Sequence, residues 1–236
     1  SRFGVVVADD IGHIREFEEK PEKPSSNLAS MGIYIFNWPT LREALLTLKD
    51  QPGCDFGMHV IPYVHEKTGN CYAYEFNGYW KDVGTIDSLY EANMDLLGDS
   101  PKFDVTDSSW KIQSRSPLAP PHYLGDGAKS ENSIIMSGCE IFGTVNNSVL
   151  ASSVVVKKGA VVKNSIIMAD VEIGENSVVE YAIIDENTVI GKNAKIGEDK
   201  ASGKGIAVLS RNISVADGAV ICGGAMVDKD VVKEEK

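Results

Sequence analysis

The sequence predicts two folds in series, an α/β domain followed by a parallel β-helix. Strand and helix patterns alternate up to residue 97, which is typical of an α/β domain. From residue 132 onward an aliphatic residue recurs every five or six positions, which is the signature of a β-helix. The stretch between them is rich in Pro, Ser and Asp and shows no sustained period. We therefore expect a domain at 1–97, a linker at 98–131 and a β-helix at 132–236.

Composition excludes several functional classes. The 236 residues carry a net charge of −11 without a run of Lys or Arg, which argues against a nucleic-acid or anionic-membrane surface. No apolar stretch approaches the roughly 20 residues that a membrane-spanning helix needs. The four cysteines have no metal-like spacing, so we expect reduced thiols in a cytoplasmic protein.

The first domain begins with a predicted β-hairpin. Residues 3–8 and 14–17 are its strands, and Gly12 in the turn can take a positive φ. A charged loop with two prolines follows at 18–27, and the apolar run 31–36 predicts a buried strand. The remaining predicted elements are helices at 37–50, 58–67 and 88–97 and a strand at 71–76.

The β-helix prediction rests on a fixed register. The gaps between successive aliphatic residues are 6, 5, 6, 6, 5, 6 and 6 for Val156, Val162, Ile167, Ile173, Val179, Ile184, Ile190 and Ile196. Each such residue is expected to stack on its equivalent in the next coil. The repeat breaks at 198–205 and then resumes loosely toward the end of the chain.

Several polar residues of the first domain are candidates for a ligand site. Glu19 and Lys20 follow a strand end, where α/β folds place ligand groups, although a solvated charged turn is an equally ordinary role. Gly4 lies inside a strand, where it permits close approach or forms a bulge, and Ser30 could instead cap a turn.

Two aspartates also qualify. Asp82 has apolar neighbours at a predicted strand end, and a carboxylate in such surroundings needs a partner, such as a metal, a salt bridge or a helix N-terminus. Asp55 could line a pocket or form a local turn.

Four motifs carry a resemblance to a known family. They are EKP (19–21), SMGIYIF (30–36), DFG (55–57) and YWKDVGT (79–85), in that order along the chain. Together they resemble the sugar-nucleotide pyrophosphorylases, most of all the bacterial glucose-1-phosphate adenylyltransferases. The resemblance implies part of a Rossmann-like nucleotidyltransferase domain followed by a left-handed β-helix.

The resemblance also implies roles for the candidate residues. Gly4, Glu19, Lys20 and Ser30 would contact glucose 1-phosphate, with Asp55 in the sugar pocket. Asp82 would bind Mg²⁺, and Lys20 and Asp82 would be the catalytic pair. The implied substrates are ATP and glucose 1-phosphate, and the implied product is ADP-glucose for glycogen synthesis. The β-helix would support a homo-oligomer, usually a tetramer, and an allosteric site.

Two departures and one missing motif limit the resemblance. Met58-His59 stands where the family usually has Lys-Asp, and Lys81 where Arg is common. The family's Gly-rich nucleotide loop is not found in this sequence. We therefore expect the C-terminal portion of the enzyme, holding mainly the sugar-phosphate side and inactive alone.

Three other functions remain open at this stage. They are a non-catalytic regulatory subunit, a related uridylyl- or thymidylyltransferase, and a hexapeptide acyltransferase. The last is weakened because the sequence has no histidine between 132 and 236 to act as a general base.

Overall fold

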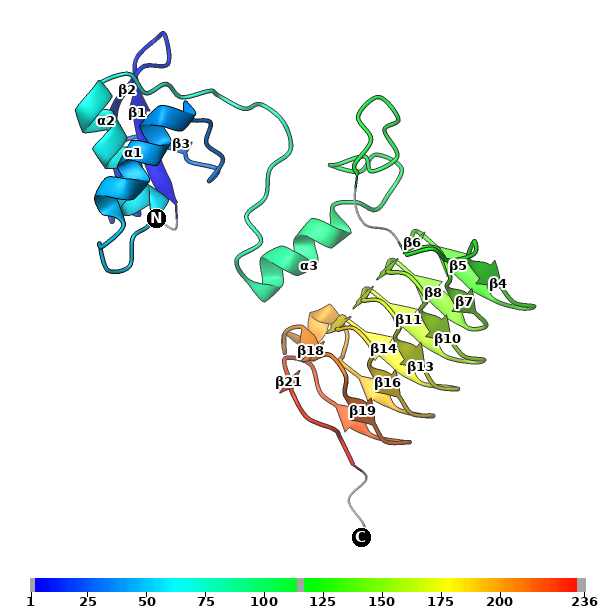
Figure 1. Cartoon of the computed structure of the whole chain (residues 1–236). Coiled ribbons are helices and arrows are strands. Elements are labelled where there is room, and N and C mark those ends of the chain that lie inside the picture. Colours follow the sequence, from blue (N-terminus) through cyan, green and yellow to red (C-terminus); the bar gives the residue numbers. More distant parts are fainter. Residues whose placement is uncertain (1–2, 114–116, 233–236) are drawn as a thin grey trace. The chain divides into compact units, whose positions relative to one another are not determined.

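The computed structural model describes residues 3–113 and 117–232. The chain separates into two compact units, residues 1–82 and residues 83–236. The first contains a small sheet with helices, and the second contains a long stack of β-coils (Figure 1).

The first unit is built on a three-stranded antiparallel sheet. Its strands are β1 (Gly4–Ala8), β2 (Ile14–Glu19) and β3 (Leu28–Ala29), in the order β2-β1-β3. The predicted hairpin is confirmed, and Gly12 in its turn has a φ of +79°. A Cβ at Gly12 would also lie 2.8 Å from the carbonyl oxygen of Ala73, so a side chain there is excluded by both strain and space.

Three helical segments pack in this unit. They are α1 (Trp38–Leu48), the π-helical turn η1 (Phe56–Val60) and α2 (Ile61–Thr68), which continues directly from η1. Ala44, Val60 and Val64 form the buried contact between them. The two helices predicted at 37–50 and 58–67 are confirmed, and Gly69 ends α2 in the left-handed conformation typical of a helix C-terminus.

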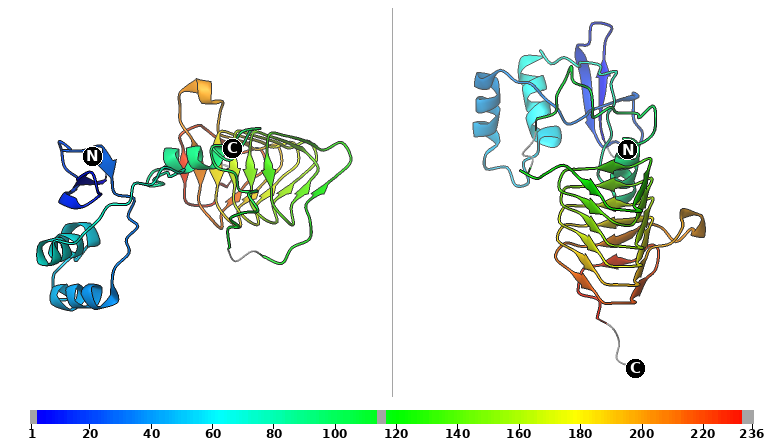
Figure 2. Two further views of the ribbon diagram at one scale, coloured as in Figure 1. Left: turned by 90° about the horizontal axis from the view of Figure 1, so that it is seen from above. Right: turned by 90° about the vertical axis from the view of Figure 1, so that its right-hand side faces the viewer.

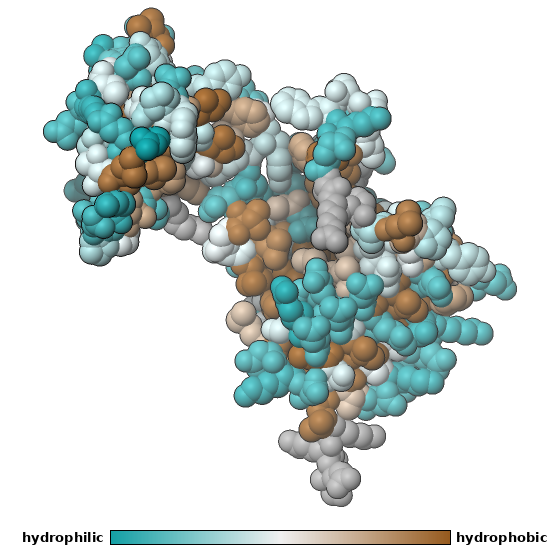
Figure 3. Space-filling view, viewed as in Figure 1, coloured by the Kyte–Doolittle hydropathy of each residue, from teal (hydrophilic) through white to brown (hydrophobic). Residues whose placement is uncertain are grey.

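Two predicted strands of the first unit are wrong. Residues 31–36 form no strand, and Ile33 and Ile35 are 73% and 99% exposed. The run 71–76 is reduced to an isolated bridge between Tyr72 and His13. The reason is non-local, because among the described residues the sheet ends at β3 and no further strand lies beside 31–36. Apolar side chains therefore remain on the surface of this unit (Figure 3).

The second unit is a parallel β-helix with three sheets of six strands each (Figure 2). The first sheet contains β4 (Tyr123–Leu124), β7 (Glu140–Ile141), β10 (Val155–Val156), β13 (Glu172–Ile173), β16 (Val189–Ile190) and β19 (Ser214–Val215). The second sheet contains β5 (Lys129–Glu131), β8 (Thr144–Asn146), β11 (Val161–Lys163), β14 (Val178–Glu180), β17 (Lys195–Ile196) and β20 (Val220–Ile221). The third sheet contains β6 (Ile134–Ile135), β9 (Val149–Leu150), β12 (Ile166–Ile167), β15 (Ala182–Ile184), β18 (Ala207–Leu209) and β21 (Met226–Val227).

The predicted register is confirmed rung by rung. Val156 pairs with Ile173, and Ile173 pairs with Ile190, so each aliphatic residue stacks on its equivalent one coil away. These inward side chains are completely buried and form one continuous core. The break predicted at 198–205 is an insertion that contains the short 3-10 helix η2 (Lys200–Ser202). The left-handed coiling stays a prediction.

A helix covers one outer face of the β-helix. This helix, α3 (Ile86–Met94), begins with a capping box between Thr85 and Ser88. Tyr90 of α3 is buried against Ile166 and Ile183, which face outward from the third sheet. A helix was predicted near here, at 88–97, as the last element of the first domain. In the structure α3 packs against the β-helix. The division into a domain at 1–97, a linker at 98–131 and a β-helix at 132–236 stays a prediction.

Candidate functional site

The carboxylate of Glu19 is the centre of the candidate site in the first unit. Glu19 ends β2 directly opposite Gly4 of β1. A Cβ at Gly4 would lie 3.0 Å from Oε2 of Glu19, and a Cβ at Gly57 would lie 2.8 Å from Cδ of Glu19. The absence of a side chain at Gly57 therefore makes room for the Glu19 carboxylate. The space at Gly4 is shared between this carboxylate and the ring of Phe17, whose Cζ would lie 2.7 Å from a Cβ at Gly4.

Lys20 adds a positive charge beside this carboxylate. Its ammonium lies 3.2 Å from Oε1 of Glu19, and the side chains of Lys20 and Glu19 are 61% and 18% exposed. Lys20 has a φ of +49°, an uncommon conformation for a residue with a side chain. The ammonium is thus held at the site while it remains accessible to an anion from solvent.

The carboxylate of Asp55 lies close to Gly57, where a Cβ would be 3.3 Å from Oδ1 of Asp55. Its Oδ1 accepts a hydrogen bond from the amide of Met58 at 2.9 Å and so caps η1. The hydrogen bond from the Met58 amide holds the pKa of Asp55 below its usual value, although partial desolvation of the carboxyl group raises this pKa. The Gly57 amide and the charges of Lys20 and His59 lower the same pKa further. The local turn considered for Asp55 from the sequence is therefore present, and its carboxylate is ionised.

The Met58-His59 departure has a structural consequence. Nδ1 of His59 accepts a hydrogen bond from the Asp55 amide at 3.2 Å, and Nε2 of His59 lies 3.3 Å from Nε2 of Gln51. Met58 is exposed. His59 therefore supports the turn that carries Asp55, a role that the sequence alone did not suggest.

Ser30 joins the group through the backbone of Gly4. Its amide donates to the carbonyl oxygen of Gly4 at 2.8 Å, and its hydroxyl lies 2.9 Å from the hydroxyl of Tyr34. Gly4 thus contacts the segments of both Glu19 and Ser30. The structure brings together Gly4, Glu19, Lys20, Ser30 and Asp55 from four segments of the chain. Gly57 belongs to this group too, although the sequence analysis assigned it no role within the DFG motif.

Asp82 is placed differently from the expectation. The sequence predicted a carboxylate among apolar neighbours at a strand end, but Asp82 is exposed and its segment forms no strand. Asp82 is also not the N-cap of the following helix, because Thr85 occupies that position in α3. The ring of Trp80, two residues earlier, packs against Phe3 at 5.5 Å between centroids, which brings this segment beside the start of β1.

The metal-binding capacity of the described residues is small. None of their His, Cys, Asp and Glu side chains form a cluster of three or more that could hold an ion. Asp82 could supply a single carboxylate oxygen, so a bound Mg²⁺ would take most of its ligands from phosphates and water.

The arrangement has a definite chemical capacity. The accessible ammonium of Lys20 is paired with the carboxylate of Glu19 and acts on the charge of Asp55, and Ser30 supplies a hydroxyl on the segment bonded to Gly4. The ammonium can hold an anionic group such as a phosphate, and the carboxylates can accept hydrogen bonds from hydroxyl groups. A ligand that carries both kinds of group fits this set better than a bare anion, which the carboxylates would repel.

Within the described parts of the chain, no helix has the length and apolar character needed to cross a membrane.

Comparison with known proteins agrees with the motifs. Residues 1–99 match the family model described as nucleotidyl transferase, and residues 123–208 match the model described as GlmU-like, C-terminal hexapeptide. The chain is 54% identical over 158 residues to a glucose-1-phosphate adenylyltransferase of Lachnospira eligens, covering 67% of this chain and 37% of the relative.

Two further relatives of the same name have similar values. The proteins of Clostridium novyi and Thermosipho africanus are each 50% identical over 165 residues, which is 69% of this chain and 43% and 40% of the relatives. The chain therefore spans about two fifths of the length of these relatives. By sequence it joins a region of the nucleotidyl transferase family to a hexapeptide β-helix, and it is a homologue of bacterial glucose-1-phosphate adenylyltransferases.

Proposed function

We propose that this chain forms the sugar-phosphate side of a glucose-1-phosphate adenylyltransferase that serves glycogen synthesis. The observation that carries the proposal is the position of the Glu19 carboxylate, which lies against Gly4 and Gly57 of two other segments and is paired with Lys20. In this reaction an oxygen of the sugar phosphate attacks the α-phosphorus of ATP, diphosphate leaves, and ADP-glucose forms. Such chemistry depends mainly on positioning the reactants and neutralising charge.

Each residue has a role that follows from its chemistry. Lys20 would hold the phosphate of glucose 1-phosphate, and Glu19 and Asp55 would accept hydrogen bonds from sugar hydroxyls. Ser30 would donate its hydroxyl to the same sugar, and Gly4 would contact glucose 1-phosphate. Asp82 would contribute one oxygen ligand to Mg²⁺, which supplies charge neutralisation at the nucleotide phosphates. Lys20 and Asp82 would be the catalytic pair.

Binding of glucose 1-phosphate tests this proposal without requiring turnover. We expect titration of the chain to shift the NMR signals of residues 4, 19, 20, 30 and 57. Lys20→Ala removes a charge-assisted hydrogen bond of about 1.5–3 kcal/mol and should weaken binding by about tenfold or more. Lys23→Ala, an exposed lysine in the same loop, is the matched control and should leave binding unchanged. Equal losses for both variants would show that Lys20 acts only through the general charge of the loop.

Kinetics separate this proposal from two alternatives, a non-catalytic regulatory subunit and a uridylyl- or thymidylyltransferase. In a protein that carries the whole nucleotidyl transferase domain, Lys20→Ala should raise KM for glucose 1-phosphate far more than KM for ATP. Asp82→Asn should lower kcat. A regulatory subunit would show neither effect, and a preference for UTP or dTTP over ATP would indicate the related transferase.

We also propose that the β-helix supports a cytoplasmic homo-oligomer, a tetramer in the arrangement that the resemblance implies, with an allosteric site. Flat parallel coils with exposed apolar residues such as Val220 and Met226 offer a surface for a second copy. Light scattering across a range of protein concentrations measures the oligomeric state. A monomer at all concentrations would contradict the proposal.

A further inference from the structure

One coil of the β-helix is shorter than its neighbours. Three residues lie between Ile141 and Val145 in the second coil, β7 to β9. Five residues lie between the equivalent positions of the third coil, Val156 and Val162, and five lie between Leu124 and Ser130 in the first coil. The second coil therefore turns this corner with two residues fewer, although its strands keep the same register.

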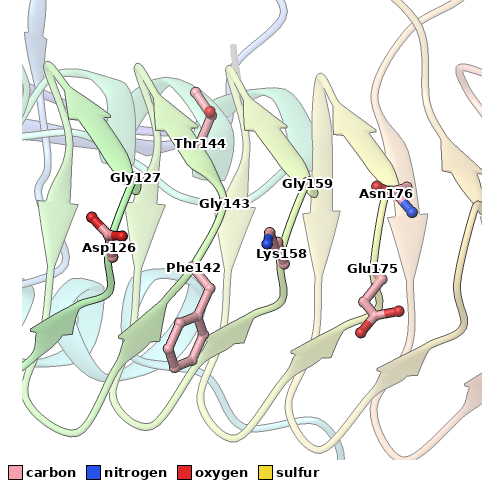
Figure 4. Close-up of a pocket in the computed structure, with 9 residues that line it drawn as sticks. All are labelled: Asp126, Gly127, Phe142, Gly143, Thr144, Lys158, Gly159, Glu175 and Asn176. Carbon is pink, nitrogen blue, oxygen red and sulfur yellow. The ribbon is translucent and has the colours of Figure 1, made fainter.

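The shortened corner leaves a notch in an otherwise regular surface. The backbone of Gly143 lies close to the next coil at this corner, because a Cβ at Gly143 would be 2.9 Å from the carbonyl oxygen of Lys157. Asp126 and Lys158, in the turns of the coils on either side, line the notch together with Phe142 and Gly143 (Figure 4). The resulting groove has a volume of about 490 Å³, within the usual range for small-molecule sites.

The floor of the notch is aromatic. Phe142 occupies the corner position that is Gly125 in the first coil and Gly174 in the fourth. Its ring lies over Gly125 and makes an edge contact with Tyr123, with 6.0 Å between ring centroids. An aromatic ring in a shallow groove gives an apolar surface on which the C–H face of a sugar ring can pack.

The walls carry charges that are not used by the fold. Among the described residues, Asp126 and Lys158 have no ion-pair partner, although other charged side chains of these coils are paired, including Lys157 with Glu172 and Lys163 with Glu180. Glu175, further along the groove, is paired with Lys192 at 3.0 Å. Asp126 can accept and Lys158 can donate hydrogen bonds to a ligand in the notch.

We infer that this notch binds a neutral oligosaccharide. An aromatic floor between a hydrogen-bond acceptor and a donor suits a pyranose ring, with one apolar face and hydroxyls around its edge. Glu175 is neutralised by Lys192, so the unpaired charges at the groove are one carboxylate, Asp126, and one ammonium, Lys158, and the absence of a net charge favours a neutral ligand over a phosphorylated one. The site lies in the β-helix and is separate from the Glu19–Lys20 site, so the inference does not depend on the proposed function.

Titration with maltotetraose and with cellotetraose, followed by NMR on the whole chain, tests the inference. We expect one of these sugars to shift the signals of Asp126, Phe142 and Lys158, and Asp126→Asn or Lys158→Gln to weaken binding by about tenfold. Lys195→Gln, an exposed lysine outside the notch, should leave binding unchanged. Failure of both sugars to bind, or shifts confined to residues 4–57, would overturn the inference.

A second variant tests the notch itself. Inserting Lys-Gly after Phe142 gives the second coil the same corner length as the third. It should fill the notch and abolish binding while the melting temperature stays the same or rises, because it restores the regular repeat. Binding that survives the insertion would show that the notch is not the site.

Discussion

The rings of Tyr90 and Tyr181 meet edge to face, with centroids 5.0 Å apart and an interplanar angle of 83°. Tyr181 stands in a column of corner residues where the preceding coils have Asn147 and Asn164, whose side chains hydrogen-bond to each other. All three residues have a positive φ, which is costly for tyrosine but ordinary for asparagine. The column therefore ends at Tyr181, whose positive φ is unfavourable but whose ring provides a surface on which α3 packs.

The Tyr90 hydroxyl stabilises this contact. It donates to the carbonyl oxygen of Asn164 at 2.9 Å. Tyr90→Phe keeps the ring contact and loses the hydrogen bond, so we expect the free energy of unfolding to fall by about 1 kcal/mol. Hydrogen exchange of α3 and the third sheet during urea unfolding measures this change. The exposed Tyr123, changed to Phe, is the control and should show no loss.

The same tyrosine predicts a loss of stability at high pH. Burial, and then the nearby Tyr181, raise the pKa of Tyr90 from 10.0 to about 12. The folded chain thus holds this proton more tightly than the unfolded chain. Its contribution to stability is complete below pH 10 and is lost as the pH rises toward about 12. The stability of the wild type relative to Tyr90→Phe should therefore fall over this interval in urea titrations. A constant difference would contradict the raised pKa.

The sequence was sufficient for the β-helix because its repeat is local. The pairing of Val156 with Ile173 follows from a 17-residue spacing that can be read from the sequence directly. The sequence analysis did not predict the shortened corner at Phe142, because the repeat was counted only from Val156 onward. A two-residue deletion changes the surface without changing which side chains face inward.

The first unit was harder to predict because its contacts are non-local. The run 31–36 has the composition of a buried strand, yet Ile35 is exposed because burial depends on neighbouring strands that composition cannot reveal. Glu19, Lys20 and Asp55 were found through motifs. The contact of Glu19 with Gly57 required the fold, since 38 residues separate them in the sequence.

A buried serine ladder inside the β-helix makes a sharp stability prediction. The hydroxyl of Ser165 donates to the carbonyl oxygen of Lys163 and accepts from the amide of Ala182 in the next coil. Ser165→Ala leaves a buried amide without its partner, which costs about 1–3 kcal/mol. We expect the β-helix to melt several degrees lower by circular dichroism. Ser214→Ala, at an exposed position, should change the melting temperature little.

Gly57→Ala tests the geometry around Glu19. The added Cβ would lie 2.8 Å from Cδ of Glu19, so the carboxylate must move. We expect glucose 1-phosphate to bind about tenfold more weakly, while the unit stays folded because the carboxylate can turn toward solvent. Met58→Ala, at the exposed neighbouring position, is the control. Unchanged binding in Gly57→Ala, measured by the same NMR titration, would remove Glu19 from the site.

The exposed apolar run gives a prediction that distinguishes surface from core in the first unit. Ile35 is 99% exposed, whereas Val60 is 1% exposed between α1 and α2. Ile35→Ser should change the free energy of unfolding by less than about 0.5 kcal/mol, and Val60→Ala should lower it by about 2 kcal/mol because it leaves a cavity. Urea unfolding followed by hydrogen exchange measures both. If Ile35→Ser cost as much as Val60→Ala, residues 31–36 would be covered in solution, and dependence of that cost on protein concentration would identify a second copy as the cover.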